Sequence, residues 1–172
     1  MNVRTDLALE AKALWEQSAG QTTRLSGVRA RERERAGFPV TEVEILDKQG
    51  EAALKKPVGR YITVELKSAD RDAHRAAQAV AQELQELLRL KDKTRVLVVG
   101  LGNEAVTPDA LGPKTVAGLF LTRHLIEHLP EHFGSLRSVS AVAPGVLATT
   151  GVETLELLRG ACAHVKPECV LC

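Results

Sequence analysis

The residues with the clearest potential for chemistry lie in a loop rich in glycine and proline, GLGNEAVTPDALGP at 100–113. This loop follows a run of apolar residues typical of a buried parallel strand and precedes a predicted helix, which is the place where open α/β sheets bind ligands. Asp109 is its candidate catalytic carboxylate. An aspartate at this position can equally cap the helix that follows. The spacing alone favours neither role.

A nucleotide-binding role for this loop is disfavoured. The first two glycines of a G-x-G-x-x-G motif are present at Gly100 and Gly102, but Ala105 stands where the third is required. Pro108 also prevents a helix from starting directly after the glycines. We expect Asn103 to secure the loop by hydrogen bonds from its side chain to the backbone rather than to touch a substrate.

Histidine, cysteine and hydroxyl side chains give weaker candidates. The histidines recur every four residues but the last lies beyond Pro130, and no second Cys/His pair accompanies the C-x-x-C at the end of the chain. The hydroxyls lack a base at recognisable spacing. We therefore predict no metal and no cofactor, and we expect surface, strand or capping roles for His124, His128, His132, Cys162, Cys169, Cys172, Ser140, Thr149 and Thr150.

Composition narrows the class of protein. The chain has 172 residues, 44% of them hydrophobic, 3% aromatic, and a formal net charge of +1. Such values are typical of one folded domain with an aliphatic core and give no general attraction to nucleic acid. The N-terminus has no apolar signal core, and no apolar run approaches the roughly 20 residues that span a bilayer. We expect no membrane insertion, a cytoplasmic location and reduced cysteines.

The elements that must position Asp109 follow from hydrophobic periodicity. From residue 70 onward the order is α-β-α-β-α-β, which predicts an α/β, three-layer fold with a mostly parallel sheet over a single domain, 1–172. Strands are expected near 43–45, 62–66, 96–99, 137–142 and 168–172, the first two forming a small antiparallel extension. Helices are expected from 7 to 18, from 70 to 88, from the loop through Leu129, and from a capping box at Thr150 and Glu153 to Gly160. The charged stretch 21–37 is expected to be a solvated helix or loop, and 47–50 a turn.

Several longer motifs resemble the spore germination endopeptidase (spore protease) family. They are VLVVGLGN at 96–103, TPDALGP at 107–113, TRHL at 122–125, SAVAPGV at 140–146 and TGVET at 150–154, with VRTDLA at 3–8 and KPVGRYITVE at 56–65 upstream. The resemblance implies a fold similar to that of hydrogenase maturation proteases. It also implies an endopeptidase that degrades small acid-soluble spore proteins in the spore core during germination, without direct nucleic acid binding, and that is a homo-oligomer when full length.

The resemblance also implies a catalytic arrangement. Family members are regarded as atypical aspartic-type proteases that use two aspartates and no metal, and Asp109 falls at the position of one of them. The second aspartate is expected directly after the strand at 168–172 and is not in this sequence. The chain therefore resembles the N-terminal and central part of a longer protease, a C-terminally truncated member, and we expect the fragment itself to be inactive.

Self-processing is a further implication of the resemblance. Thr5-Asp6-Leu7-Ala8 is similar to the family's substrate pattern, which predicts cleavage between Asp6 and Leu7 and a propeptide of residues 1–6. Asp6 can instead cap a helix that begins near Leu7. Two other functions stay open: a nickel-dependent maturation peptidase of the same fold, and a non-catalytic fragment or binding module. The roles of Lys56, Tyr61, Arg123 and His124 are also open.

Overall fold

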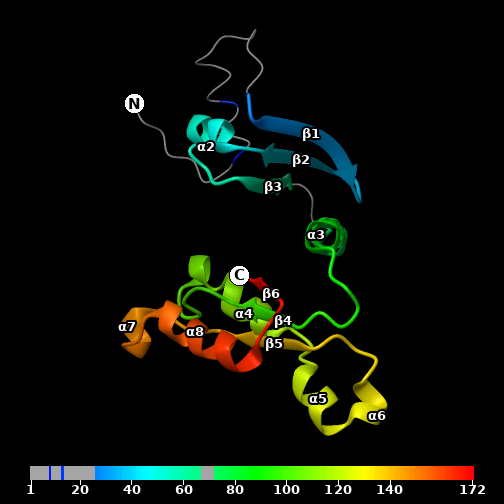
Figure 1. Ribbon diagram of the computed structural model, residues 1–172, viewed down its shortest axis with the longest axis vertical. Helices are drawn as coiled ribbons and strands as arrows, with labels where there is room; N and C mark the ends of the chain where they lie inside the picture. The colour runs from blue at the N-terminus through cyan, green and yellow to red at the C-terminus, as the bar shows by residue number, and fades with distance from the viewer. Residues whose placement is uncertain (1–7, 9–12, 14–25, 67–71) are drawn as a thin grey trace. The chain divides into compact units, whose positions relative to one another are not determined.

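The computed structural model describes residues 8, 13, 26–66 and 72–172 (Figure 1). The chain forms two compact units, Met1–Arg89 and Leu90–Cys172, which are described in turn. The sequence-based prediction that they belong to one domain stays a prediction. In the part of the chain that the structure describes, no helix is long and apolar enough to cross a bilayer.

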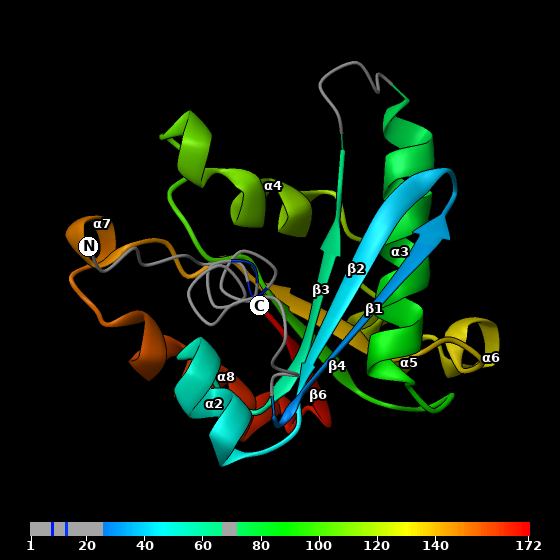
Figure 2. The same ribbon diagram turned by 90° about the horizontal axis from the view of Figure 1, so that it is seen from above.

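The first unit contains an antiparallel sheet of three strands. These are β1 (Val28–Arg35), β2 (Phe38–Ile45) and β3 (Gly59–Val64), with β2 in the middle (Figure 2). The predicted strands near 43–45 and 62–66 and their antiparallel pairing are confirmed. Helix α2 (Lys48–Leu54) follows β2, and helix α3 (Ala73–Leu88) follows β3.

One face of this sheet carries the core of the first unit. Val43 and Ile45 of β2 are 1% exposed and pack with Leu54 of α2 and with Ala8. Asp47 begins α2, because its side chain accepts hydrogen bonds from the backbone N–H groups of Gln49 and Gly50. The expectation of a turn at 47–50 was wrong, since the aspartate acts as a helix cap.

The conformation of β1 differs from a second expectation. The stretch 21–37 was expected to be a solvated helix or loop, but Val28–Arg35 pairs along its full length with β2; residues 21–25 lie outside the described residues. In a strand, successive side chains point to opposite faces. The alternating charges of this segment therefore separate into an arginine row on one face and Ala30, Glu32 and Glu34 on the other. Two members of the row, Arg33 and Arg35, form ion pairs with Glu83 of α3.

The second unit contains a parallel sheet in the order β5-β4-β6. Its strands are β4 (Val96–Val99), β5 (Val139–Val142) and β6 (Cys169–Leu171), and all four residues of the central strand β4 are buried. The predicted parallel pairing of these strands is confirmed. The connecting segments form the 3-10 turn η1 (Thr107–Asp109) and helices α4 (Leu111–Ala117), α5 (Arg123–His128), α6 (Pro130–Phe133), α7 (Leu147–Thr150) and α8 (Thr154–Val165).

Two predicted helices of this unit differ from those observed. The helix expected to reach Leu129 is interrupted after Ala117, because Thr122 is tied to β5: its Oγ1 donates to the Arg137 carbonyl and accepts from the Val139 N–H at 2.9 Å. The capping box at Thr150 is also wrong. Thr150 ends α7, Glu153 precedes α8 without a side-chain cap, and α8 continues past Gly160 to Val165.

Candidate active site

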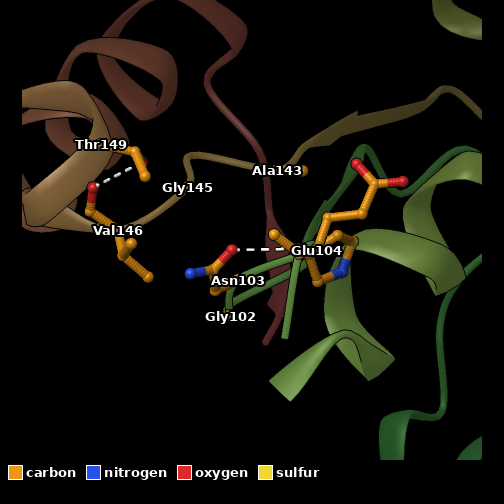
Figure 3. Close-up of a pocket in the computed structure, with 9 residues that line it drawn as sticks. Gly102, Asn103, Glu104, Ala143, Gly145, Val146 and Thr149 are labelled. Carbon is orange, nitrogen blue, oxygen red and sulfur yellow. Dashed lines mark hydrogen bonds between the residues drawn. The ribbon is translucent and has the colours of Figure 1, made fainter. Parts of the chain in front are cut away.

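The loop at 100–113 starts at the carboxyl end of β4, next to the carboxyl end of β5. The Gly100 N–H donates to the Val142 carbonyl at 2.9 Å, so the segment after β5 runs beside the start of the loop. Together the two segments line a cavity of about 420 Å³. Its lining residues are Gly102, Asn103, Glu104, Ala105, Pro113, Ala143, Gly145, Val146 and Thr149 (Figure 3).

Close backbone contacts between its two ends give the loop its shape. A Cβ on Gly100 would lie 2.3 Å from the Gly112 carbonyl oxygen, and one on Gly102 would lie 2.0 Å from the Asp109 carbonyl oxygen. Gly102 also has a φ of +128°, which side chains disfavour. The glycines allow the start of α4 to pack directly on the end of β4, and this fixes where Asn103 and Asp109 lie.

Asp109 holds the loop closed. Its Oδ2 accepts a hydrogen bond from the Asn103 N–H at 2.7 Å, and its carbonyl oxygen lies 3.1 Å from the same nitrogen. Helix α4 begins after Ala110 without a side-chain cap, so the capping role weighed for Asp109 was wrong. The side chain is exposed, and its Oδ1 accepts no hydrogen bond from the described residues. Asp109 does not itself line the cavity, but it accepts a hydrogen bond from Asn103, which is one of the lining residues.

The side chain of Asn103 also stabilises the loop. Its Oδ1 accepts from the Ala105 N–H at 3.0 Å, and its carbonyl accepts from the Val106 N–H at 3.1 Å. The expectation that Asn103 secures the loop is therefore confirmed. Asn103 additionally lines the cavity, which the sequence had not indicated.

Sequence reasoning also missed the other wall of the cavity. The segment after β5 contributes Ala143, Gly145 and Val146, and the first turn beyond it contributes Thr149, whose Oγ1 donates to the Val146 carbonyl at 2.9 Å. The available signal was the Pro144-Gly145 pair directly after a predicted parallel strand, because neighbouring parallel strands end at the same edge of a sheet. The wall is apolar except for Thr149.

None of the residues that line this cavity is a histidine or a cysteine. The described residues include no group of three His, Cys, Asp or Glu side chains placed to hold a metal ion. The Tyr61 hydroxyl donates to the Pro57 carbonyl at 2.7 Å, and Arg123 pairs with Glu127 one turn along α5 at 3.0 Å. All three cysteines are free thiols. The predicted cleavage residues, Asp6 and Leu7, lie outside the described residues.

The cavity combines groups suited to a peptide. Asn103 and Thr149 offer hydrogen-bonding groups, and Ala105, Pro113 and Val146 offer apolar surface. Glu104 is exposed and adds a negative charge. Exposed carboxylates can accept a proton from water, and an amide can donate to a carbonyl oxygen.

Comparison with known proteins identifies the family. A model of the germination protease family matches residues 7–172. The chain is 48% identical over 99% of its length to the germination protease of Caldanaerobacter subterraneus, and it covers 53% of that relative. It is 40% identical to the germination protease of Clostridium tetani and 42% identical to that of Priestia megaterium, covering 54% and 49% of them. The chain spans about half the length of these relatives, and it belongs to the germination protease family.

Proposed function

We propose that this chain carries half of the catalytic machinery of a spore germination endopeptidase, with Asp109 as a catalytic carboxylate. The observation that carries the proposal is how the two oxygens of this carboxylate are hydrogen-bonded. Oδ2 is fixed by the Asn103 N–H, whereas Oδ1 accepts no hydrogen bond from the described residues and the side chain is exposed. A carboxylate with one oxygen anchored and the other free is oriented for proton transfer.

The reaction is hydrolysis of a peptide bond by general acid–base catalysis. Asp109 accepts a proton from a water molecule, and the water oxygen adds to the carbonyl carbon. The C–N bond then breaks as the leaving nitrogen receives a proton from a carboxyl group. A second carboxyl that shares one proton with Asp109 allows one group to act as base while the other acts as acid.

The register of β6 supports a second carboxylate at the same edge. Leu171 of β6 pairs with Val98 of β4, so residues that follow this strand in a longer chain would start level with Gly100. In the family resemblance, the second aspartate comes directly after this strand. Both carboxylates would then lie at the carboxyl end of one parallel sheet, where α/β enzymes place their sites.

The substrates, processing and location are part of the same proposal. The substrates are small acid-soluble spore proteins, the location is the spore core, and the full-length enzyme is a homo-oligomer that needs no metal. Activation removes residues 1–6 by cleavage between Asp6 and Leu7. N-terminal sequencing of the activated enzyme checks this step, and an active enzyme that still begins at Met1 contradicts it.

A fusion tests the central claim. The chain is joined after Cys172 to the part of the Caldanaerobacter subterraneus protease that it does not match, and cleavage of a purified small acid-soluble spore protein is measured. Asp109→Asn keeps an oxygen that can accept from the Asn103 N–H, so the melting temperature should stay unchanged. The rate should fall by about 10²–10⁴-fold, because general base catalysis is lost.

Controls separate this mechanism from its alternatives. Asp92→Asn makes the same chemical change at an exposed aspartate outside the cavity and should leave the rate unchanged. A near-normal rate in Asp109→Asn refutes the catalytic role. Loss of activity on chelation, with recovery on adding nickel, favours the maturation-peptidase alternative. The 172-residue chain on its own should not cleave the substrate.

A further inference from the structure

The two ends of the Asn103 side chain have different surroundings. Oδ1 accepts from the Ala105 N–H at 3.0 Å. A backbone N–H can only donate, so the oxygen of the amide must be the atom that faces Ala105. The position of the NH₂ group is thereby fixed on the opposite side of the amide.

The NH₂ group of Asn103 is an oriented donor without an acceptor. Among the described residues, Nδ2 has no hydrogen-bond partner, and the half-buried side chain lines the cavity. In Figure 3 the amide nitrogen of Asn103 lies on the side opposite the dashed hydrogen bond that its oxygen accepts, and it points toward Val146 of the other wall. An amide donor held in this way needs no rearrangement to bind a carbonyl oxygen, so its interaction costs little conformational entropy.

We propose that Asn103 Nδ2 donates a hydrogen bond to the carbonyl oxygen of the peptide bond that is cleaved. This inference rests on the proposed peptidase function for its reaction. When the water oxygen adds to the carbonyl carbon, the π electrons of the C=O bond move to that oxygen, and the proton of the water goes to the carboxylate. Asn103 stabilises the resulting oxyanion and itself gains or loses no atom.

One hydrogen bond links this donor to the proposed base. The Asn103 N–H donates to Asp109 Oδ2 at 2.7 Å, so the same residue anchors the base through its backbone and faces the cavity through its side chain. The relative position of base and oxyanion donor is therefore set by the loop itself. The competing explanation is that Asn103 only secures the loop through Oδ1.

Asn103→Asp distinguishes the two explanations. Aspartate keeps an oxygen for the Ala105 N–H but replaces the donor by an acceptor, so the melting temperature of the fusion should be unchanged. We expect kcat to fall by about 10²–10³-fold, the usual effect of removing one oxyanion donor, with KM nearly unchanged. Gln78→Glu is the matched control, because it makes the same amide-to-carboxylate change at an exposed position of α3. An unchanged kcat in Asn103→Asp overturns the proposal.

The pH profile separates loss of the donor from the added charge. Loss of the donor lowers the maximum of the pH–rate profile, because the oxyanion is stabilised less at every pH. An effect of the added charge alone would shift the profile along the pH axis and leave its maximum unchanged. A profile that is shifted but keeps its full maximal rate therefore also overturns the proposal.

A binding experiment keeps this test independent of the peptidase activity. The ¹⁵N-labelled 172-residue chain is titrated with the blocked tripeptide acetyl-Ala-Val-Ala-amide, and the side-chain NH₂ signals of Asn103 are identified by their absence in Asn103→Asp. We expect one of these protons to shift downfield. If the fusion cleaves nothing but this shift appears, the peptidase function fails and the carbonyl-binding role stands. No shift up to the solubility limit of the peptide overturns that role.

Discussion

Replacing Glu83 tests what holds α3 against the sheet of the first unit. The carboxylate of Glu83 is 5% exposed and accepts from Arg33 Nε at 3.0 Å and from Arg35 Nε at 2.8 Å. These bonds lower the pKa of Glu83 below its ordinary value of 4.5, the bond from Arg33 most of all. Glu83→Gln keeps the shape and nearly the helix propensity of the side chain, and removes its charge.

The expected loss is about 2–4 kcal/mol in the free energy of unfolding of this unit. A hydrogen bond to a charged group contributes about 1.5–3 kcal/mol, and breaking a buried ion pair costs about 3–5 kcal/mol. The arginine side chains are 23% and 27% exposed, so water recovers part of this loss. Glu86→Gln is the control: Glu86 is 48% exposed and, among the described residues, forms an ion pair with Arg35 alone, which predicts a loss below about 1 kcal/mol.

Amide hydrogen exchange of β2 measures the effect in this unit alone, because the β2 backbone is paired on both sides. The difference in β2 exchange protection between wild type and Glu83→Gln should have its full size above pH 4.5, and it should shrink as the pH falls through the lowered pKa of folded Glu83. Equal effects of Glu83→Gln and Glu86→Gln would refute the argument, because burial would then not matter. A difference that is independent of pH would refute the ionic origin.

Two further predictions concern buried polar groups. The hydrogen bonds from Arg60 and Arg33 lower the pKa of Glu42 from 4.5 to about 2. Glu42 should therefore contribute about 3 kcal/mol to the free energy of unfolding above pH 4.5 and lose this contribution toward pH 2. A ¹³C titration that gives an ordinary pKa for Glu42 contradicts this prediction. Thr122→Val removes the hydrogen bonds between the start of α5 and β5 and should lower the free energy of unfolding of the second unit by about 2 kcal/mol, measured by chemical denaturation. Thr115→Val removes an exposed hydroxyl and should change this free energy by no more than about 0.5 kcal/mol.

The apolar strands of the second unit were predictable because each has a simple pattern. Val96–Val99 is a continuous apolar run, and β4 is buried on both faces. Strand β1 was not predictable in the same way, because its pattern is one of charge. Arg33 and Arg35 read as solvated residues until their partner, Glu83, is brought close by a helix 50 positions away in the sequence. Only the tertiary contact with Glu83 shows that these arginines are paired rather than solvated.

The candidate site was predictable in place but not in detail. The loop at 100–113 was identified from its position after a buried strand, and the role of Asn103 in securing it followed from the residue type. Sequence spacing could not show that Asp109 binds the Asn103 N–H instead of capping α4. That choice depends on how the backbone folds back at Gly102, which is a property of the whole loop.

Gly102 therefore gives a decisive test of the site's geometry. In Gly102→Ala the new Cβ would lie 2.0 Å from the Asp109 carbonyl oxygen, at a φ of +128°, so the turn that holds Asp109 must move. We expect the second unit to lose about 2–4 kcal/mol, from backbone strain and steric displacement together. The Asn103 amide should lose its protection from hydrogen exchange, since its acceptors are both on Asp109.

Gly151→Ala is the matched control for this substitution. Gly151 has a φ of +70°, but apart from its own chain neighbours no heavy atom of the described residues lies within 4 Å of a Cβ placed there. Gly151→Ala should lower the free energy of unfolding only by the penalty for a side chain at positive φ, about 1–2 kcal/mol. The Asn103 amide should stay protected from hydrogen exchange. If Gly102→Ala costs no more than Gly151→Ala and leaves that amide protected, the loop is not closed by direct contact between residues 102 and 109. The placement of Asp109 and Asn103 argued above would then be wrong, because both rest on that contact.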